Sequence, residues 1–320
     1  MPPYSVGGKP VAPRKAFGEA LAAMATSWPD IVVIDGDVKN STLTELFQKA
    51  APDRFFEGYI AEQNMVGMAF GLSTLGYRPW VSSFGVFLTN RALDQVRMLV
   101  SQTKAPVRLA AAYSGLLNGA SGKTHQDIED FAIMRAMPNM TVLAPADEIE
   151  AAHAIRWAAD HDGPLYIRLA RDPVPPVFDQ NYTFMPGKPV LLRNSDNGLV
   201  IISTGVQTAR TTAALDLLHA DGIHLRHLHL HTLKPANADA IIAHLAGASA
   251  VCTVEEHTII GGLGELVSDL VTRDGLGARV TRIGLDDRWS ESGPNDFLLD
   301  KHGLSPHRVA DRLRRLLPAA

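Results

Sequence analysis

The sequence predicts an α/β protein with two doubly wound domains, each built on a mainly parallel sheet. Three observations support this prediction. Short apolar runs alternate with stretches of helical character along most of the chain. One proline-rich stretch interrupts this alternation near the middle. The 320 residues, of which 46% are hydrophobic and 20% charged, are enough for two domains with buried cores.

The first half of the chain contains five apolar runs that predict buried strands, at residues 31–34, 80–84, 107–112, 141–144 and 165–169. Four stretches between them predict helices, at residues 61–75, 89–103, 127–137 and 147–161. Buried strands that alternate with helices are typical of a parallel sheet with helices on both faces.

Residues 171–190 read RDPVPPVFDQNYTFMPGKPV and contain five prolines. Proline lacks the N–H that helices and central strands need, so this stretch is expected to contain neither. We interpret residues 173–189 as a linker between a first domain, residues 1–172, and a second domain, residues 190–320.

The second half repeats the alternation. It predicts strands at residues 199–203, 225–230, 250–254 and 280–283, and helices at residues 208–220, 236–245 and 264–271. A last helix is expected to begin at Ser305–Pro306, because serine caps helices and proline fits their first turn.

Composition excludes several classes of protein. The net charge of −4 gives no general attraction for nucleic acid or for an anionic membrane, and we expect neither as a partner. The single cysteine, Cys252, excludes an intrachain disulfide and a cysteine metal cluster. The sequence contains no run of about 18 apolar residues, so we predict no membrane span. The first residues lack the apolar core of a signal peptide, so we expect a cytoplasmic protein.

Four residues are candidates for chemistry. Glu62 begins a helix that continues with small and apolar residues, where a carboxylate close to a buried cleft could transfer protons, although it could simply stabilise the helix N-terminus. His125 follows a Ser-Gly-Lys-Thr loop, and a helix cap beside an incidental histidine is the alternative. Phe84 and Phe87 follow a strand end, where they could serve as core residues or as a platform for a planar ring.

Two histidine-containing segments could suggest metals. His227, His229 and His231 share one face of a predicted strand, for which a solvated or interdomain face is the favoured interpretation. The run from Glu255 to His257 lacks a zinc-binding spacing. We therefore predict no metal site within this chain.

Six motifs occur in a recognisable order: IAEQNM, SFGVF, GKTHQ leading to IEDFAIMRAMPN, VLAPAD, GPLYIRLAR and VEEHTIIGGLGE. Together they resemble the C-terminal half of transketolase, which combines a pyrimidine-binding domain with a C-terminal domain. The resemblance covers nearly the whole chain. The chain as a whole is similar to the small subunit of transketolases that are split over two chains. Pyruvate dehydrogenase β subunits and deoxyxylulose-phosphate synthase share this architecture, but MRAMPN, APAD and YIRLAR favour transketolase.

The resemblance implies a thiamine diphosphate enzyme, in which a glutamate hydrogen-bonds N1′ of the cofactor's aminopyrimidine. Glu62 matches that glutamate, and Phe84 and Phe87 match aromatic residues against the pyrimidine ring. His125 matches a histidine beside the aminopyrimidine and the reacting carbon.

Two further positions are implied to lie near the cofactor. Asp37 matches an aspartate at the subunit interface, and its alternative role is that of a turn residue. Asn90 stands where the family often has a third aromatic residue.

The same resemblance implies a site for sugar phosphates. Arg14, Ser41 and Arg171 match phosphate-binding positions, and two forked guanidinium groups suit a dianionic phosphate. Tyr113 and Ser121 stand where transketolases have a histidine and an aspartate that contact substrate, and His125 lies close by. We therefore expect altered acceptor specificity.

The Gly-Asp-Gly…Asn motif that holds diphosphate and Mg²⁺ in this family is missing, since residues 35–37 read Asp-Gly-Asp. The resemblance thus implies an N-terminal partner subunit that mainly holds the diphosphate and Mg²⁺, in an α2β2 assembly. The alternative function is a 2-oxo-acid dehydrogenase β subunit or a deoxyxylulose-phosphate-synthase-like enzyme. Arg14, Ser41 and Arg171 speak against the dehydrogenase subunit, which needs no phosphate-binding residues. A non-catalytic homologue is a third hypothesis, against which Glu62 and His125 speak.

Overall fold

The structure is a computed structural model that describes residues 8–317. Its first sheet has seven strands in the order β10-β5-β6-β4-β3-β1-β2, and all neighbours are parallel except β10 and β5. The strands are β1 (Ile31–Asp35), β2 (Phe55–Glu57), β3 (Arg78–Phe84), β4 (Arg108–Ala112), β5 (Thr141–Leu143), β6 (Leu165–Leu169) and β10 (Thr232–Lys234).

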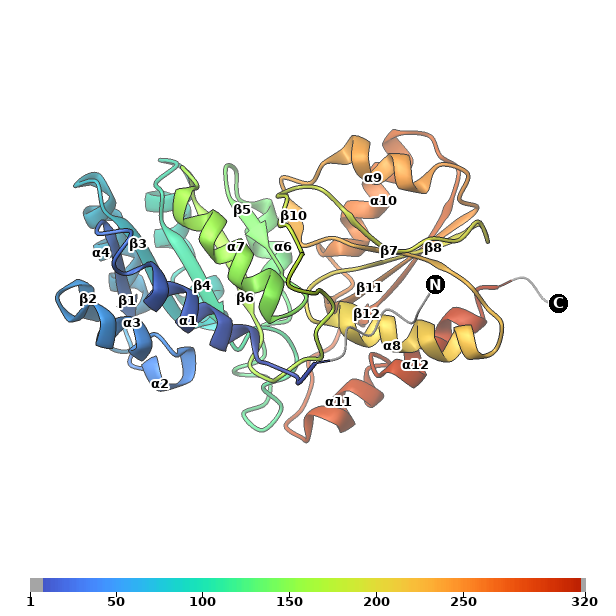
Figure 1. The fold of residues 1–320 in the computed structure, drawn as a ribbon, viewed down its shortest axis with the longest axis horizontal. Helices are drawn as coiled ribbons and strands as arrows, with labels where there is room; N and C mark the ends of the chain where they lie inside the picture. The colour runs from blue at the N-terminus through green and yellow to red at the C-terminus, as the bar shows by residue number, and fades with distance from the viewer. Residues whose placement is uncertain (1–7, 318–320) are drawn as a thin grey trace.

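Helices cover both faces of this sheet (Figure 1). They are α1 (Pro13–Met24), α2 (Lys39–Thr42), α3 (Glu45–Ala50), α4 (Glu62–Thr74), α5 (Leu93–Gln95), α6 (Asp130–Ala136) and α7 (Glu148–Asp160). On one face, α1 packs against α7 and α3 over Phe17, Phe47 and Trp80. On the other face, Met65 of α4 and Phe131 of α6 belong to a second core.

The second sheet has five strands in the order β12-β11-β8-β9-β7, parallel except for the pair of β7 and β9. The strands are β7 (Val190–Arg193), β8 (Leu199–Ser203), β9 (Arg226–His229), β11 (Ala250–Thr258) and β12 (Arg279–Leu285). The helices are α8 (Gln207–Ala220), α9 (Ala238–Leu245), α10 (Leu263–Arg273), α11 (Asn295–Lys301) and α12 (Pro306–Arg314). In Figure 1, α9 and α10 lie on one side of this sheet, and α8 and α12 lie on the other.

The two sheets are joined more closely than the sequence indicated. Strand β10 comes from the second half of the chain but pairs with β5 of the first sheet. One apolar core contains Val142 of β5 and also Leu228 and Val251 of the second sheet. Residues 173–189 contain no helix or strand apart from a bridge between Val174 and Val11. The division at residues 172 and 190 remains a prediction, because both β10 and this core cross it.

The predicted α/β class with two mainly parallel sheets is confirmed. All nine predicted strands are present with shifts of a few residues at most. The predicted helix over residues 89–103 is wrong as a regular helix, because π-helical turns at Phe87–Arg91 and Val96–Ser101 flank the short α5. Ser305 caps α12 as expected, with Pro306 at its first position.

His227, His229 and His231 are all buried, so the solvated interpretation is wrong, and a contact of His229 with the first half of the chain supports the interdomain interpretation. The Nε2 atom of His229 lies 2.7 Å from Oε2 of Glu150, which belongs to α7 of the first half. His227 contacts the Ser203 hydroxyl at 2.8 Å. Burial lowers the pKa of His231 to about 4, which keeps this ring neutral near pH 7.

His257 on β11 is another buried histidine, and it lies at the junction of the two halves. Its Nδ1–H donates to the Thr258 carbonyl at 2.6 Å, and Nε2 accepts from the Ala132 N–H at 3.4 Å. Burial, and then the charge of Arg168, lower the pKa of His257 to about 3. The folded protein therefore holds this ring neutral under conditions in which the unfolded chain protonates it.

We expect His257→Gln to lose less stability than the parent between pH 7 and pH 5, by about 2 kcal/mol in the free energy of unfolding. A histidine whose pKa is lowered on folding contributes stability at pH values above its unfolded pKa of about 6.5. This contribution is lost as the pH falls below that value. Burial raises the pKa of Asp130 to about 6 and that of Glu255 to about 7. These two acids add stability as the pH falls, and they do so in the parent and in the variant alike. Denaturant unfolding at the two pH values gives the difference. Equal pH slopes would contradict the prediction, and the exposed His307→Gln is the control.

Within residues 8–317, no helix has the length and apolar character needed to cross a membrane.

Candidate active site

The carboxylate of Glu62 is buried at the first residue of α4, with only 1% of the residue exposed. Its Oε1 accepts a hydrogen bond from the Ser83 hydroxyl at 3.1 Å, and its Oε2 pairs with Nη1 of Arg91 at 2.7 Å. The close approach of α4 to the loop before it requires Gly58, because a Cβ there would lie 2.4 Å from Met65 Cγ. The fold thus fixes a buried carboxylate at the first residue of a helix, with a donor on each of its oxygens.

Four aromatic side chains form a half-buried wall near Glu62. Phe84 ends β3 and Tyr113 follows β4; because these strands are parallel neighbours, both rings emerge at one edge of the sheet. The Phe84 ring lies 4.4 Å from Tyr113 and 6.2 Å from Phe87 between centroids. His125 approaches Phe84 and Phe87 edge-on at 6.0 and 5.3 Å. Such a wall can pack against a planar heterocycle.

Tyr113 also joins this wall to the predicted anion-binding residues. Its φ of +60° is the left-handed conformation that favours glycine, and strain of this kind is typical of functional sites. The guanidinium groups of Arg14 and Arg171 lie 5.2 and 5.4 Å from the Tyr113 ring centroid. Arg14 donates to the Arg171 carbonyl at 2.9 Å and to the carbonyl of Ser41. Ser121 lines a pocket with Tyr113 and Arg171.

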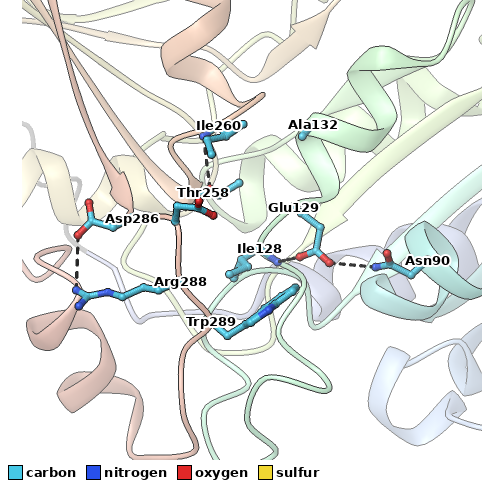
Figure 2. A pocket seen from close by; sticks show the side chains of 10 residues that line it. Asn90, Ile128, Glu129, Ala132, Thr258, Ile260, Asp286, Arg288 and Trp289 are labelled. Atoms are coloured by element: carbon cyan, nitrogen blue, oxygen red, sulfur yellow. Dashed lines mark hydrogen bonds and ion pairs between the residues drawn. The ribbon is translucent and has the colours of Figure 1, made fainter.

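Asp37 and Asn90 lie outside these groups. Asp37 is exposed after β1, has a φ of +63°, and donates its N–H to Glu57 Oε1 at 2.9 Å. The amide of Asn90 donates to Glu129 at 3.3 Å inside a pocket of about 560 Å³ that Trp289 also lines (Figure 2). Neither contact gives evidence for a role at the aromatic wall, so both cofactor roles stay predictions.

The structure also places Arg91 and Ser83 at the site, which sequence reasoning missed. Arg91 lies 4.3 Å above the Phe87 ring, and 40% of its side chain is exposed. It sits in the π-helical turn Phe87–Arg91, so its direction does not follow the usual helical period. A hydroxyl and a guanidinium therefore orient the two carboxylate oxygens of Glu62.

The loop that carries His125 is supported by buried charges. Asp127 accepts from the Thr89 hydroxyl at 3.1 Å, and burial raises the pKa of Asp127 well above its ordinary value. Arg168 donates to the Asp127 carbonyl and to the Glu256 carbonyl of β11, each at 3.0 Å. Its Nε lies 3.1 Å from Asp130 Oδ2. Through these contacts Arg168, which lies on β6 of the first sheet, is joined to the loop, to α6 and to the second sheet.

Comparison with known proteins agrees with this arrangement. Residues 9–176 match the family described as transketolase, pyrimidine binding domain, and residues 187–309 match transketolase, C-terminal domain. The chain belongs to the transketolase family. This transketolase-family chain is 38% identical over 302 residues to a transketolase C-terminal section of Methanocaldococcus jannaschii, covering 94% of each. It is 36% identical to human transketolase, of which it spans 51%.

One solved structure has the same fold as this chain over nearly the whole length of both. The structure described as "Split gene transketolase, inactive beta4 tetramer" superposes with a TM-score of 0.88 at 38% identity, covering 96% of this chain and 98% of that one. Transketolase from Campylobacter jejuni shares the fold with a TM-score of 0.82 at 19% identity, and the match covers 47% of that protein.

The residues present fit the aminopyrimidine half of thiamine diphosphate. A buried carboxylate with two fixed donors stands at the helix start, and a half-buried aromatic wall lies near it. Between residues 8 and 317, no group of three or more His, Cys, Asp or Glu side chains is arranged to hold a metal.

Proposed function

We propose that this chain is the small subunit of a split, thiamine-diphosphate-dependent transketolase-like enzyme. It would transfer a two-carbon ketol unit from a ketose or its phosphate to an aldose or its phosphate, together with an N-terminal-type subunit. The observation that carries the proposal is the buried Glu62, next to an aromatic wall and a pair of arginines. The split relatives of similar length support the need for a second subunit.

Thiamine diphosphate, when bound, supplies the nucleophilic carbon that carries the two-carbon unit. The carboxyl group of Glu62 would hold a proton at N1′ of the aminopyrimidine, with Ser83 and Arg91 fixing its orientation. Phe84 and Phe87 would exclude water from the ring, which strengthens the Glu62 hydrogen bond. Asp37 and Asn90 are proposed to lie at the edge of the cofactor.

On the substrate side, His125 would move protons on the sugar. Its Nδ1 lies 2.9 Å from the Thr124 hydroxyl, so Nε2 is the nitrogen that can act on a substrate. Arg14 and Arg171, with Ser41, would bind the phosphate. Tyr113 and Ser121 offer only neutral hydroxyls at positions where transketolases have charged or ionisable groups, so we propose a changed preference among acceptors.

We propose that the diphosphate and Mg²⁺ are held mainly by the partner, in an α2β2 assembly. The isolated chain should therefore bind thiamine diphosphate weakly and catalyse no ketol transfer, and the partner should restore both. Calorimetry with and without Mg²⁺, followed by a transfer assay on the mixed subunits, makes the test. Tight Mg²⁺-dependent binding by the isolated chain would contradict the proposal.

A further inference from the structure

Asp127, two residues after His125, is a fully buried acid that has no role in the proposed function. Its backbone is held from two sides, because its carbonyl accepts from the Gly115 N–H at 2.9 Å and from Arg168 at 3.0 Å. Gly115 lies in the loop after β4, and Arg168 lies on β6. The side chain of Asp127 therefore starts from a fixed point close to His125.

The carboxyl group of Asp127 contacts the segment that follows β3. Its Oδ1 lies 3.1 Å from the Thr89 hydroxyl, in the π-helical turn that begins at Phe87 and ends at Arg91. Its Oδ2 lies against Gly85, where a Cβ would be only 2.5 Å from this oxygen. The acid thus touches, at two points, the segment that supplies one ring of the aromatic wall and the guanidinium group paired with the buried glutamate.

The Thr89 hydroxyl has one hydrogen but two acceptors within reach. These are the Gly85 carbonyl at 3.0 Å and Asp127 Oδ1 at 3.1 Å. The Asn90 amide also donates to this hydroxyl, at 3.2 Å. If Asp127 is ionised, both acceptors compete for the single hydrogen of Thr89. If Asp127 is protonated, its own O–H donates to Thr89, and the Thr89 hydrogen is left for the carbonyl.

The surroundings of Asp127 also favour a neutral carboxyl group. Within residues 8–317, Asp127 takes part in no ion pair, and its Oδ2 has no hydrogen-bond partner. Arg168 is near, but its Nε pairs with Asp130 at 3.1 Å. A buried carboxylate without a counter-ion takes up a proton instead.

The neighbouring charges act in the same direction. Burial, and then the charges of Asp130 and Glu129, raise the pKa of Asp127 well above its ordinary value, although Arg168 opposes them. Burial also raises the pKa of the Tyr166 phenol on β6, so this group stays neutral. Two acids and one cation that is already paired therefore surround the carboxyl group.

We propose that Asp127 is a positioning residue that acts in its protonated form. Its O–H donates to Thr89 and thereby holds the π-helical turn against the loop that carries His125. Because this turn supplies Phe87 and Arg91 to the candidate active site, one hydrogen bond aligns both side chains with His125. The expected effect on turnover rests on the proposed function, whereas the protonation of Asp127 does not.

The proton on Asp127 can be tested on the full chain without an assay of turnover. We expect the infrared difference spectrum between the parent and Asp127→Asn at pH 7 to show the C=O band of a protonated carboxylic acid in the parent only. Thr89→Val should shift this band, because it removes the group to which the O–H donates. Absence of the band overturns the proposal. The control is the exposed Asp274→Asn, which should leave the band in place.

Assays of the two-subunit enzyme test the positioning role. We expect Asp127→Leu to lower kcat at least about tenfold, because small displacements of catalytic groups are costly. Asp127→Asn should keep kcat within about threefold of the parent, because its amide N–H can donate to Thr89 as the acid does. Thr89→Val should lose as much as Asp127→Leu. The double variant should lose no more than either, because both substitutions remove the same hydrogen bond.

Two kinetic outcomes would overturn the positioning role: Asp127→Asn as harmful as Asp127→Leu, or losses that multiply in the double variant. If Asp127→Leu does not fold, Thr89→Val decides. If the assembled enzyme transfers no ketol unit but the acid band is present and shifts in Thr89→Val, the proposed function fails and the hydrogen bond from protonated Asp127 is supported.

Discussion

Glu62→Gln should fold normally and lose at least about a hundredfold in kcat when assembled with partner and cofactor. An amide keeps the shape of the side chain. Its oxygen can still accept from Arg91, and its NH2 can donate to the Ser83 hydroxyl, which also accepts hydrogen bonds. The amide cannot hold a proton for the ring nitrogen, and positioned acid–base groups contribute about 10²–10⁴ in rate. Steady-state transfer assays and thermal unfolding of both proteins give the measurement.

The matched control is Glu45→Gln on α3, where the carboxylate pairs with Lys49 at 3.4 Å on the surface. It makes the same chemical change far from the aromatic wall and should leave kcat unaltered. Turnover close to that of the parent in Glu62→Gln would remove Glu62 from the mechanism. Equal losses in both variants would point to a general effect of the substitution.

The strands of this fold were predictable because buried parallel strands are mostly continuous apolar runs, as in Ile31–Ile34 of β1. Helix α1 was not predicted, although its first residue is Pro13 and proline is favoured at the start of a helix. The pairing of β10 with β5 depends on contacts between distant segments. No local pattern encodes such a pairing.

The residues of the candidate site were likewise predictable only in part. Glu62, Phe84, Phe87 and His125 were singled out because helix starts and strand ends in α/β sheets are where ligands bind. Arg91 could not be predicted, because a π-helical turn shifts its direction relative to the usual helical period.

The contact between Gly119 and Asn295 was missed for a different reason. The N–H of Gly119 donates to Oδ1 of Asn295, which lies 176 residues away along the chain. Tertiary packing alone brings them to one pocket.

Arg168→Met should lower the free energy of unfolding by about 3–5 kcal/mol near pH 8, the largest effect on stability that we expect. Arg168 is 8% exposed and pairs with the fully buried Asp130, which also accepts from the Tyr166 hydroxyl at 2.7 Å. Removing the cation leaves a carboxylate in the core without its charged partner. The double variant with Asp130→Asn should recover part of the loss, because it removes that carboxylate charge as well.

The loss should depend on pH in a defined direction. Burial raises the pKa of Asp130 to about 6 although Arg168 lowers it, so the pKa rises further when Arg168 is removed. An acid whose pKa is higher in the folded chain than in the unfolded chain costs stability as the pH rises from the unfolded value to the folded one. Without Arg168 the pKa of folded Asp130 is higher, so its ionisation continues to cost stability above pH 6. The destabilisation of the variant should therefore be smaller at pH 5 than at pH 8.

Denaturant unfolding at both pH values measures this difference. Arg308→Met provides the control, because its pair with Asp300 at 2.9 Å is exposed and such pairs contribute little. A loss that is the same at pH 5 and pH 8 would mean that Asp130 does not carry the uncompensated charge. Because Arg168 also holds the Asp127 carbonyl, two residues from His125, the variant should lose transferase activity even under conditions in which it remains folded.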